Sequence, residues 1–306
     1  MKRFVLSLVL TLPFLAASAQ ITLSGGKNGF PLVGSKGPAT IFYDKSDALV
    51  VERSAMMLSQ DISDVTGQAL PLNSGAPGTQ KVSCAVIAGT VGQSRWAEAV
   101  IASGQVDTTG LGGSWERYQV QLVKNPVKGV GQALVILGSD RRGTAFGVLS
   151  ISRAVGVSPW KWWMDARPQK RSSVTLEVTP FMSREPSVKY RGVFINDEDF
   201  GLLPWARKTY EPEVGNIGPR TYARVCELLL RLNANYLAPA MHEASIAFFK
   251  LPANQLVADS FAVVMGSSHC EPLLLNTASE WDRSRYGAWD YVSNRRVMDS
   301  VLNASV

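Results

Sequence analysis

Cysteine is scarce in this sequence, with Cys84, Cys226 and Cys270 the only three in 306 residues. An odd number without close spacing does not predict a disulfide framework. Beyond the amino terminus there is no run of about 20 apolar residues, so we expect a soluble mature protein without a membrane partner. Phosphate loops of the G-x-x-x-x-G-K-[ST] type and G-x-S-x-G elbows are absent, which disfavours P-loop enzymes and α/β-hydrolase esterases. The net charge is +6, but no basic run is long enough to predict nucleic-acid binding.

The amino terminus has the composition of a secretory signal peptide. Lys2 and Arg3 precede an apolar run over residues 4–17, and Ala-Ser-Ala at residues 17–19 fits a signal peptidase site. We therefore expect residues 1–19 to be removed and the mature protein to be exported, to the periplasm or the extracellular space. An uncleaved membrane anchor is the alternative, which the short apolar run disfavours.

Residues 20–180 alternate short apolar strands with amphipathic helices. An apolar share of 46% and a charged share of 18% predict a packed core rather than disorder. The expected strands cover residues 39–43, 84–90, 118–123 and 133–138, and the expected helices cover residues 47–66 and 144–155. This order predicts an amino-terminal mixed α/β sandwich domain, in which helices cover one face of an open sheet.

From residue 181 the pattern changes to repeated β/α units, so the overall fold class is α/β. The expected buried strands cover residues 189–195, 234–239 and 261–266, and helices follow at residues 219–232 and 252–259. A (β/α)8 TIM barrel needs about 250 residues. Residues 181–306 therefore hold about three units, and we expect the start of a catalytic TIM barrel that is truncated.

Polar, titratable residues follow each of these three strands. The first strand leads into Asn196, Asp197, Glu198 and Asp199, the second into His242 and Glu243, and the third into His269 and Glu271. In a parallel β/α barrel the carboxyl ends of the strands carry the catalytic groups. Carboxylates there can act as acid and base or bind sugar hydroxyls, although a solvated loop with a helix cap is the plainer alternative for the acidic run.

The two histidines of the chain each have a glutamate close by. We expect His242 and His269 to bind a charged or polyhydroxylated ligand, and satisfied core positions are the alternative. Two histidines and two glutamates could also ligate zinc, but neither spacing is of the helical H-E-x-x-H type, so we expect no metal. Arg191, inside the first strand, could pair with a sugar carboxylate.

Two further segments allow two interpretations each. Trp160, Trp162 and Trp163 lie within nine residues of sequence, a density typical of an interface between domains, while a sugar-stacking platform is the functional alternative. Residues 139–143, Ser-Asp-Arg-Arg-Gly, could form an anion site at a helix amino terminus. We favour a tight turn that caps the following helix.

Taken together, five segments resemble glycoside hydrolase family 115, the xylan α-1,2-glucuronidases. They are residues 138–144, 156–163, 190–198, 232–241 and 266–272. The resemblance implies release of glucuronic acid or 4-O-methyl-glucuronic acid from xylan or glucuronoxylan oligosaccharides, with inversion and without a cofactor. It also implies a longer protein that works as a homodimer and carries the activity.

On this resemblance Asp197 and Glu198 are the candidate catalytic residues. Asn196, Arg191, His242, Glu243, His269 and Glu271 are the candidate substrate ligands. Inversion needs one carboxylic acid and one carboxylate base, and the sequence does not assign these two roles. A hexosaminidase-like exo-glycosidase and a non-catalytic carbohydrate-binding protein are the alternative functions.

Overall fold

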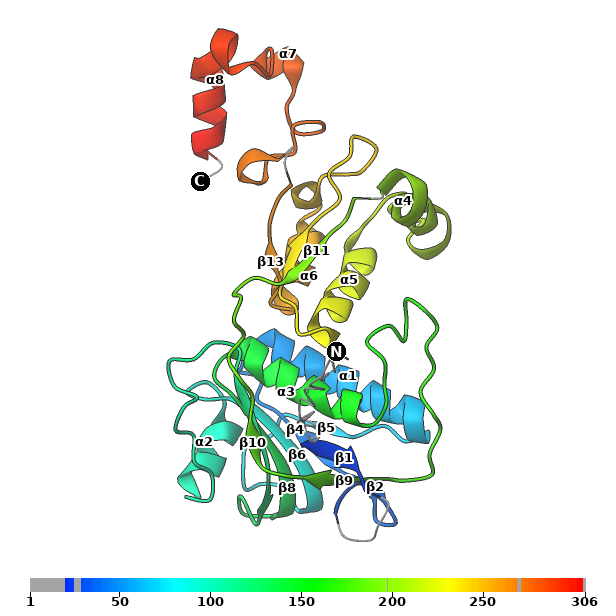
Figure 1. The fold of residues 1–306 in the computed structure, drawn as a ribbon, viewed down its shortest axis with the longest axis vertical. Helices are drawn as coiled ribbons and strands as arrows, with labels where there is room; N and C mark the ends of the chain where they lie inside the picture. The colour runs from blue at the N-terminus through cyan, green and yellow to red at the C-terminus, as the bar shows by residue number, and fades with distance from the viewer. Residues whose placement is uncertain (1–19, 25–28, 197, 269–270, 305–306) are drawn as a thin grey trace, which may run out of the picture.

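The computed structural model describes residues 20–24, 29–196, 198–268 and 271–304. The predicted signal peptide and the predicted site residues Asp197 and His269 lie outside these ranges. Figure 1 shows two parts stacked along the long axis of the molecule, with α7 (Arg283–Tyr286) and α8 (Tyr291–Ala304) projecting from one end. In the described ranges no helix is long and apolar enough to cross a membrane.

A six-stranded mixed sheet forms the centre of the first part, in the order β10-β7-β8-β6-β4-β5. The strands are β4 (Thr40–Phe42), β5 (Leu72–Asn73), β6 (Val82–Thr90), β7 (Tyr118–Lys124), β8 (Val130–Gly138) and β10 (Phe181–Met182). Strands β5, β4, β6 and β8 run parallel, and β7 is antiparallel to both β8 and β10. Because β10 pairs with β7, this sheet extends to Met182, two residues past the predicted domain limit.

Helices cover both faces of that sheet. Helices α1 (Leu49–Thr66) and α3 (Arg141–Ala154) share a core with Ile41, Val86 and Ile136. On the other face, α2 (Arg95–Ala102) buries Trp96, which stacks on Phe42 at 4.3 Å between ring centres. The sequence predicts helices on one face only, so α2 is a correction; at eight residues it is too short to give a strong periodic signal.

A second sheet, in the order β1-β9-β2-β3, is antiparallel throughout. Its strands are β1 (Ile21–Leu23), β2 (Phe30–Gly34), β3 (Gly37–Pro38) and β9 (Val174–Val178). Phe30, Leu32 and Leu176 are fully buried and belong to the same core as α1 and α3. Strand β9 follows the tryptophan-rich segment, residues 160–163. The chain therefore adds another strand to the first part before it enters the second.

Local sequence fixes the ends of the two long helices. The Asp140 carboxylate accepts hydrogen bonds from the backbone N–H groups of Arg142 (2.9 Å) and Gly143 (2.8 Å), which caps α3. This confirms the capped turn in place of an anion site. Helix α1 ends at Gly67, whose φ of 79° is the left-handed conformation that glycine adopts without strain.

The second part is built on three short parallel strands in the order β11-β12-β13. They are β11 (Gly192–Phe194), β12 (Tyr236–Ala238) and β13 (Val264–Met265), with α5 (Pro219–Arg231) and α6 (Pro252–Ser260) as the connecting helices. Shorter elements fill the loops: η1 (Glu198–Leu202), α4 (Leu203–Trp205), η2 (Ala206–Tyr210), η3 (Phe248–Lys250) and η4 (Pro272–Leu274). The β/α alternation predicted from the sequence is therefore present.

Strand β11 differs from its prediction as a buried strand. Val193 is 40% exposed and Phe194 is 41% exposed. Within the described ranges β11 pairs only with β12, so it is an edge strand of this sheet.

The two parts share one continuous core. Helices α5 and α6 lie against α3 and α1, and the buried side chains of Leu229 and Phe261 belong to the same apolar cluster as α1 and α3. Trp162 also contacts Trp205 (5.7 Å) and Tyr210 (5.0 Å) edge-on. The predicted interface role of the tryptophan-rich segment is confirmed by these contacts.

Candidate active site

The carboxyl ends of β11, β12 and β13 meet at one edge of the parallel sheet. Asn196 follows β11 and is exposed, His242 and Glu243 follow β12 and are exposed, and Glu271 follows β13 and is buried. The structure thus places four of the eight predicted site residues at the edge where parallel sheets place ligands. Asp197 and His269 lie outside the described residues, and so does the Glu198 side chain.

A contact between a carboxylate and an imidazole links the first two strand ends. Asp199 Oδ2 lies 3.0 Å from His242 Nδ1, and the two side chains are 33% and 50% exposed. The Ala244 N–H group also points at Nδ1, at the longer distance of 3.4 Å. The shorter contact involves a charged acceptor and is the stronger of the two, so Asp199 is the group that orients this ring.

A buried amide links the second and third strand ends. Asn276, 1% exposed, donates through Nδ2 to Met241 O (2.9 Å) and to Glu271 Oε1 (3.1 Å). The other oxygen of Glu271 faces the Ser268 N–H group at 3.5 Å. Glu271 is 4% exposed, so its carboxylate is held in one position by these neighbours. Sequence reasoning missed Asn276, because an isolated asparagine in a loop carries no pattern.

Arg191 does not join this edge. It precedes β11, and its guanidinium donates to Glu116 Oε2 (2.5 Å), to Asn233 O (2.7 Å) and to Val188 O (2.8 Å). These partners lie at the amino end of the strand, opposite to the end that leads into Asn196. The guanidinium therefore fastens β11 to the first part, and nothing in its position supports the predicted pairing with a sugar carboxylate.

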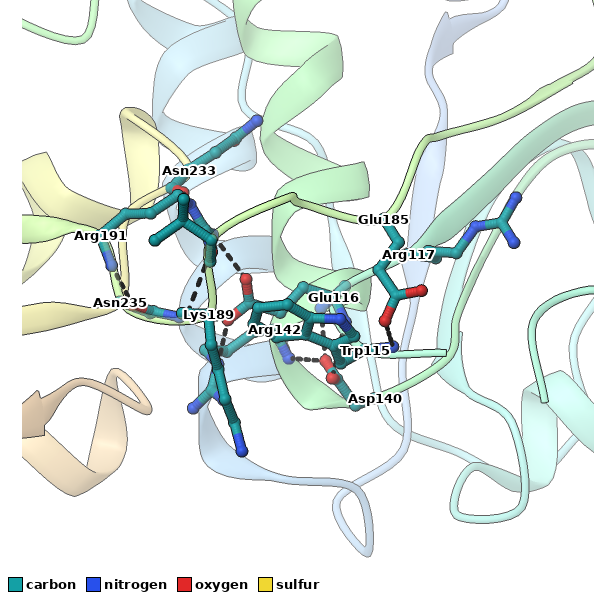
Figure 2. Close-up of polar contacts among 12 residues, drawn as sticks. Trp115, Glu116, Arg117, Asp140, Arg142, Glu185, Lys189, Arg191, Asn233 and Asn235 are labelled. Atoms are coloured by element: carbon teal, nitrogen blue, oxygen red, sulfur yellow. Dashed lines mark hydrogen bonds and ion pairs between the residues drawn. The ribbon is translucent and has the colours of Figure 1, made fainter. Parts of the chain in front are cut away.

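Glu116 is the centre of the contact at the amino ends of the strands (Figure 2). Its carboxylate is fully buried and accepts from Arg142 Nε (2.6 Å) and Asn235 Nδ2 (2.5 Å) as well as from Arg191. Its own N–H group donates to Asp140 Oδ2 (2.8 Å). The four partners come from α3 and its cap and from the segments before β11 and β12, so one side chain joins both parts.

No three histidine, cysteine, aspartate or glutamate side chains lie close enough together to hold a metal ion in the ranges that the structure covers. The titratable side chains described at this edge are the Asp199–His242 pair, Glu243 and Glu271. The fold and the site together define a β/α protein whose polar groups lie at the carboxyl ends of its parallel strands.

Comparison with known proteins makes the assignment more specific. Residues 183–306 match the sequence profile of glycosyl hydrolase family 115. The solved structure of BtGH115A, a family GH115 4-O-methyl-alpha-glucuronidase with specificity for decorated arabinogalactans, is 37% identical. The match covers 93% of this chain and 34% of BtGH115A, with a TM-score of 0.75. The chain belongs to glycosyl hydrolase family 115 and spans about a third of the length of that relative.

More distant structures resemble the chain only weakly. The Streptomyces plicatus N-acetyl-beta-hexosaminidase is 14% identical, with a TM-score of 0.45 over 81% of this chain and 44% of its own. CpGH84D is 10% identical, with a TM-score of 0.45 over 80% of this chain and 35% of its own. Likenesses at this level carry no argument about function. No curated protein sequence matches the chain.

Proposed function

We propose that this chain forms the amino-terminal part of an exported glycoside hydrolase that removes glucuronic acid or 4-O-methyl-glucuronic acid from a decorated polysaccharide. The observation that carries the proposal is the 37% identity to BtGH115A over 93% of the chain. We infer xylan or glucuronoxylan as the substrate from the resemblance of the sequence motifs. Decorated arabinogalactan is the second candidate, because BtGH115A acts on it.

The proposed architecture is the first three units of a (β/α)8 barrel. The parallel order β11-β12-β13 with helices between the strands supports it. Residues 20–180 form the amino-terminal domain in this proposal, residues 181–306 begin the barrel, and residues 1–19 are the signal for export. The homodimer that the resemblance implies would be a property of the longer protein.

The proposed chemistry is hydrolysis with inversion. One carboxylic acid protonates the leaving oxygen, and a second carboxylate, about 6.5–9.5 Å away, activates water. We assign Asp197 to the reacting centre and Glu198 next to it, at the carboxyl end of β11. Asn196, Glu243, His269 and Glu271 would bind sugar hydroxyls or the uronic acid carboxylate. His242, oriented by Asp199 at 3.0 Å, would do the same.

The test measures uronic acid released from glucuronoxylan and from decorated arabinogalactan, for this chain and for the longest polypeptide that its gene encodes. NMR of the first product anomer separates inversion from retention. Asp197→Ala should lower the rate by at least about 10²-fold, as expected when an acid or base is removed. Asp107→Ala, an exposed aspartate of the first part, is the matched control and should keep the full rate.

Three outcomes would contradict the proposal. A near-normal rate for Asp197→Ala removes this residue from the reacting centre. Release of N-acetylhexosamine in place of uronic acid supports the hexosaminidase-like alternative. Polysaccharide binding without turnover, by the longest polypeptide as well as by this chain, supports the non-catalytic carbohydrate-binding protein.

A further inference from the structure

A groove of about 700 Å³ lies between the tryptophan-rich segment and the helical stretch that follows β11. Its lining includes Lys161, Trp162, Trp163, Asp165, Leu202 and Trp205. The volume falls within the range of about 300–1,000 Å³ that is usual for small-ligand sites. Leu202 ends η1 (Glu198–Leu202). The same short helix begins in the acidic turn of the candidate active site, which is the sequence 196–199 after β11.

The indole rings of this groove are held in fixed orientations. Trp162 meets Trp163 edge-on, with ring centres 4.8 Å apart and planes at 85°. The Trp163 Nε1–H group donates to Arg224 O at 3.2 Å, and the Arg224 guanidinium lies 4.9 Å from the centre of the Trp162 ring. Tyr210 stacks against Trp205 at 4.9 Å. A ligand would therefore meet rings that are already ordered, which lowers the entropy cost of binding.

These rings are also more exposed than indoles that serve packing alone. Trp96 in the core of the first part is 0% exposed. Trp162, Trp163 and Trp205 are each only partly buried, although they contact one another, and all three line the groove. Flat aromatic surface with a few polar groups at its edge suits a ligand that has apolar faces and hydroxyl groups, as pyranose rings do.

The charges of the groove favour a neutral ligand over an anionic one. Lys161 Nζ lies 2.6 Å from both Asp61 Oδ1 and Asp64 Oδ2, so its positive charge is already paired, and Asp61 is shared with Arg231 at 2.7 Å. Asp165 adds an exposed carboxylate at the rim, which repels anions and accepts hydrogen bonds from hydroxyl groups. The Arg224 guanidinium beside the Trp162 ring is paired as well, with Glu227 Oε2 at 2.9 Å. A uronic acid would therefore compete with carboxylates for each of these cations, whereas a neutral sugar would find an acceptor and three rings.

We propose that this aromatic groove binds a short stretch of the neutral main chain of the polysaccharide. It would be a second binding site, separate from the edge of the sheet where the uronic acid is released. Family membership makes a polysaccharide the ligand class, and the ring and charge arrangement selects its neutral pyranose units. The position of Leu202 on η1 puts the groove and the acidic turn on one short element, so main chain and side group could be held together.

The experiment uses neutral oligosaccharides, so that its result does not depend on turnover. Xylohexaose and a galactan hexasaccharide are added in turn to the full chain, and oxidation of each tryptophan by N-bromosuccinimide is followed by peptide mass spectrometry. Binding of the same probes is measured by calorimetry. We expect one of them to slow oxidation of Trp162 and Trp205 several-fold, while Trp160, 41% exposed and outside the lining, reacts at an unchanged rate.

Two variants test the residues. Asp165 has a φ of 49°, so Asp165→Gly removes the carboxylate without backbone strain, and affinity for the protecting sugar should fall about tenfold. Trp205→Leu should abolish binding, and Trp160→Leu, the control, should bind like the parent chain. Unchanged affinity in both Asp165→Gly and Trp205→Leu would overturn the proposal, as would absence of any protection by millimolar sugar.

Protection of the rings without sugar in the longest polypeptide would also overturn the proposal, because protein would then cover the groove. These results are independent of the release of uronic acid. A chain that binds neutral sugar but releases none leaves the groove standing and contradicts only the proposed activity.

Discussion

Replacing Glu116 by alanine removes a carboxylate that three side chains share. Arg142, Arg191 and Asn235 all donate to it at 2.5–2.6 Å, and the Glu116 side chain has no exposed surface. The substitution leaves two guanidinium groups facing each other without the anion between them. Their side chains are only 15% and 26% exposed, so water can replace the lost partner in part.

The cost follows from that burial. Breaking a buried ion pair from one side typically costs about 3–5 kcal/mol, because the remaining charge is left uncompensated. The substitution leaves two unpaired cations, Arg142 and Arg191, which raises this estimate, and their partial exposure lowers it. We therefore expect Glu116→Ala to reduce the free energy of unfolding by about 4 kcal/mol. Adding Arg191→Ala should cost less than the sum of the single changes, because it removes one of the stranded cations.

Urea denaturation followed by tryptophan fluorescence measures this loss. Glu213→Ala is the matched control, because Glu213 pairs with Arg220 at 2.6 Å but both side chains are about half exposed. It should leave the midpoint unchanged, as exposed pairs contribute little. A shift for Glu116→Ala no larger than that of Glu213→Ala would refute the idea that Glu116 joins the two parts.

Two more predictions concern titration and reactivity. Hydrogen bonds from the Arg95 side chain hold the pKa of the Asp44 carboxyl well below its usual range, so its contribution to stability is complete above about pH 4 and is lost as the pH falls further. Asp44→Asn should have a lower free energy of unfolding than the parent chain at pH 7. That free energy should also fall less steeply than in the parent chain between pH 4 and pH 2, as measured by urea denaturation. Parallel pH profiles for the two chains would contradict this prediction. Burial raises the pKa of the Cys226 thiol to about 12. A thiol reagent at pH 8 should label the partly exposed Cys84 and reach Cys226 only after unfolding, and equal rates in the native chain would contradict this.

Features encoded by neighbouring residues could be predicted from the sequence. The helix expected over residues 47–66 is α1 at Leu49–Thr66, and the one expected over 144–155 is α3 at Arg141–Ala154. Their ends depend on Gly67 and on the Asp140 cap, which act within four residues of sequence. The β/α alternation after residue 181 has the same local origin, in apolar runs separated by polar turns.

Contacts between distant residues could not be predicted in this way. Glu116 and Asn235 are 119 positions apart, and neither lies in a recognisable pattern. The wrong prediction for Arg191 has the same cause. A strand pattern predicts where a strand lies, but it does not predict which end of the strand a long side chain reaches. The candidate site was predicted as a set of strand ends, whereas the pairing of Asp199 with His242 and the bridge made by Asn276 depend on tertiary structure.

The arrangement around β11 separates stability from chemistry along one short strand. Arg191 and Asn196 are five residues apart, which is roughly 16 Å at the rise of an extended strand. At the amino end, Arg191 and its partner Glu116 anchor the strand to the first part of the chain. At the carboxyl end, Asn196 is exposed and the Asp199 side chain is 33% exposed. Because the anchoring contacts lie at the amino end of the strand, we expect the exposed Asn196 side chain at the carboxyl end to contribute little to folding, which leaves it free for the ligand role proposed above.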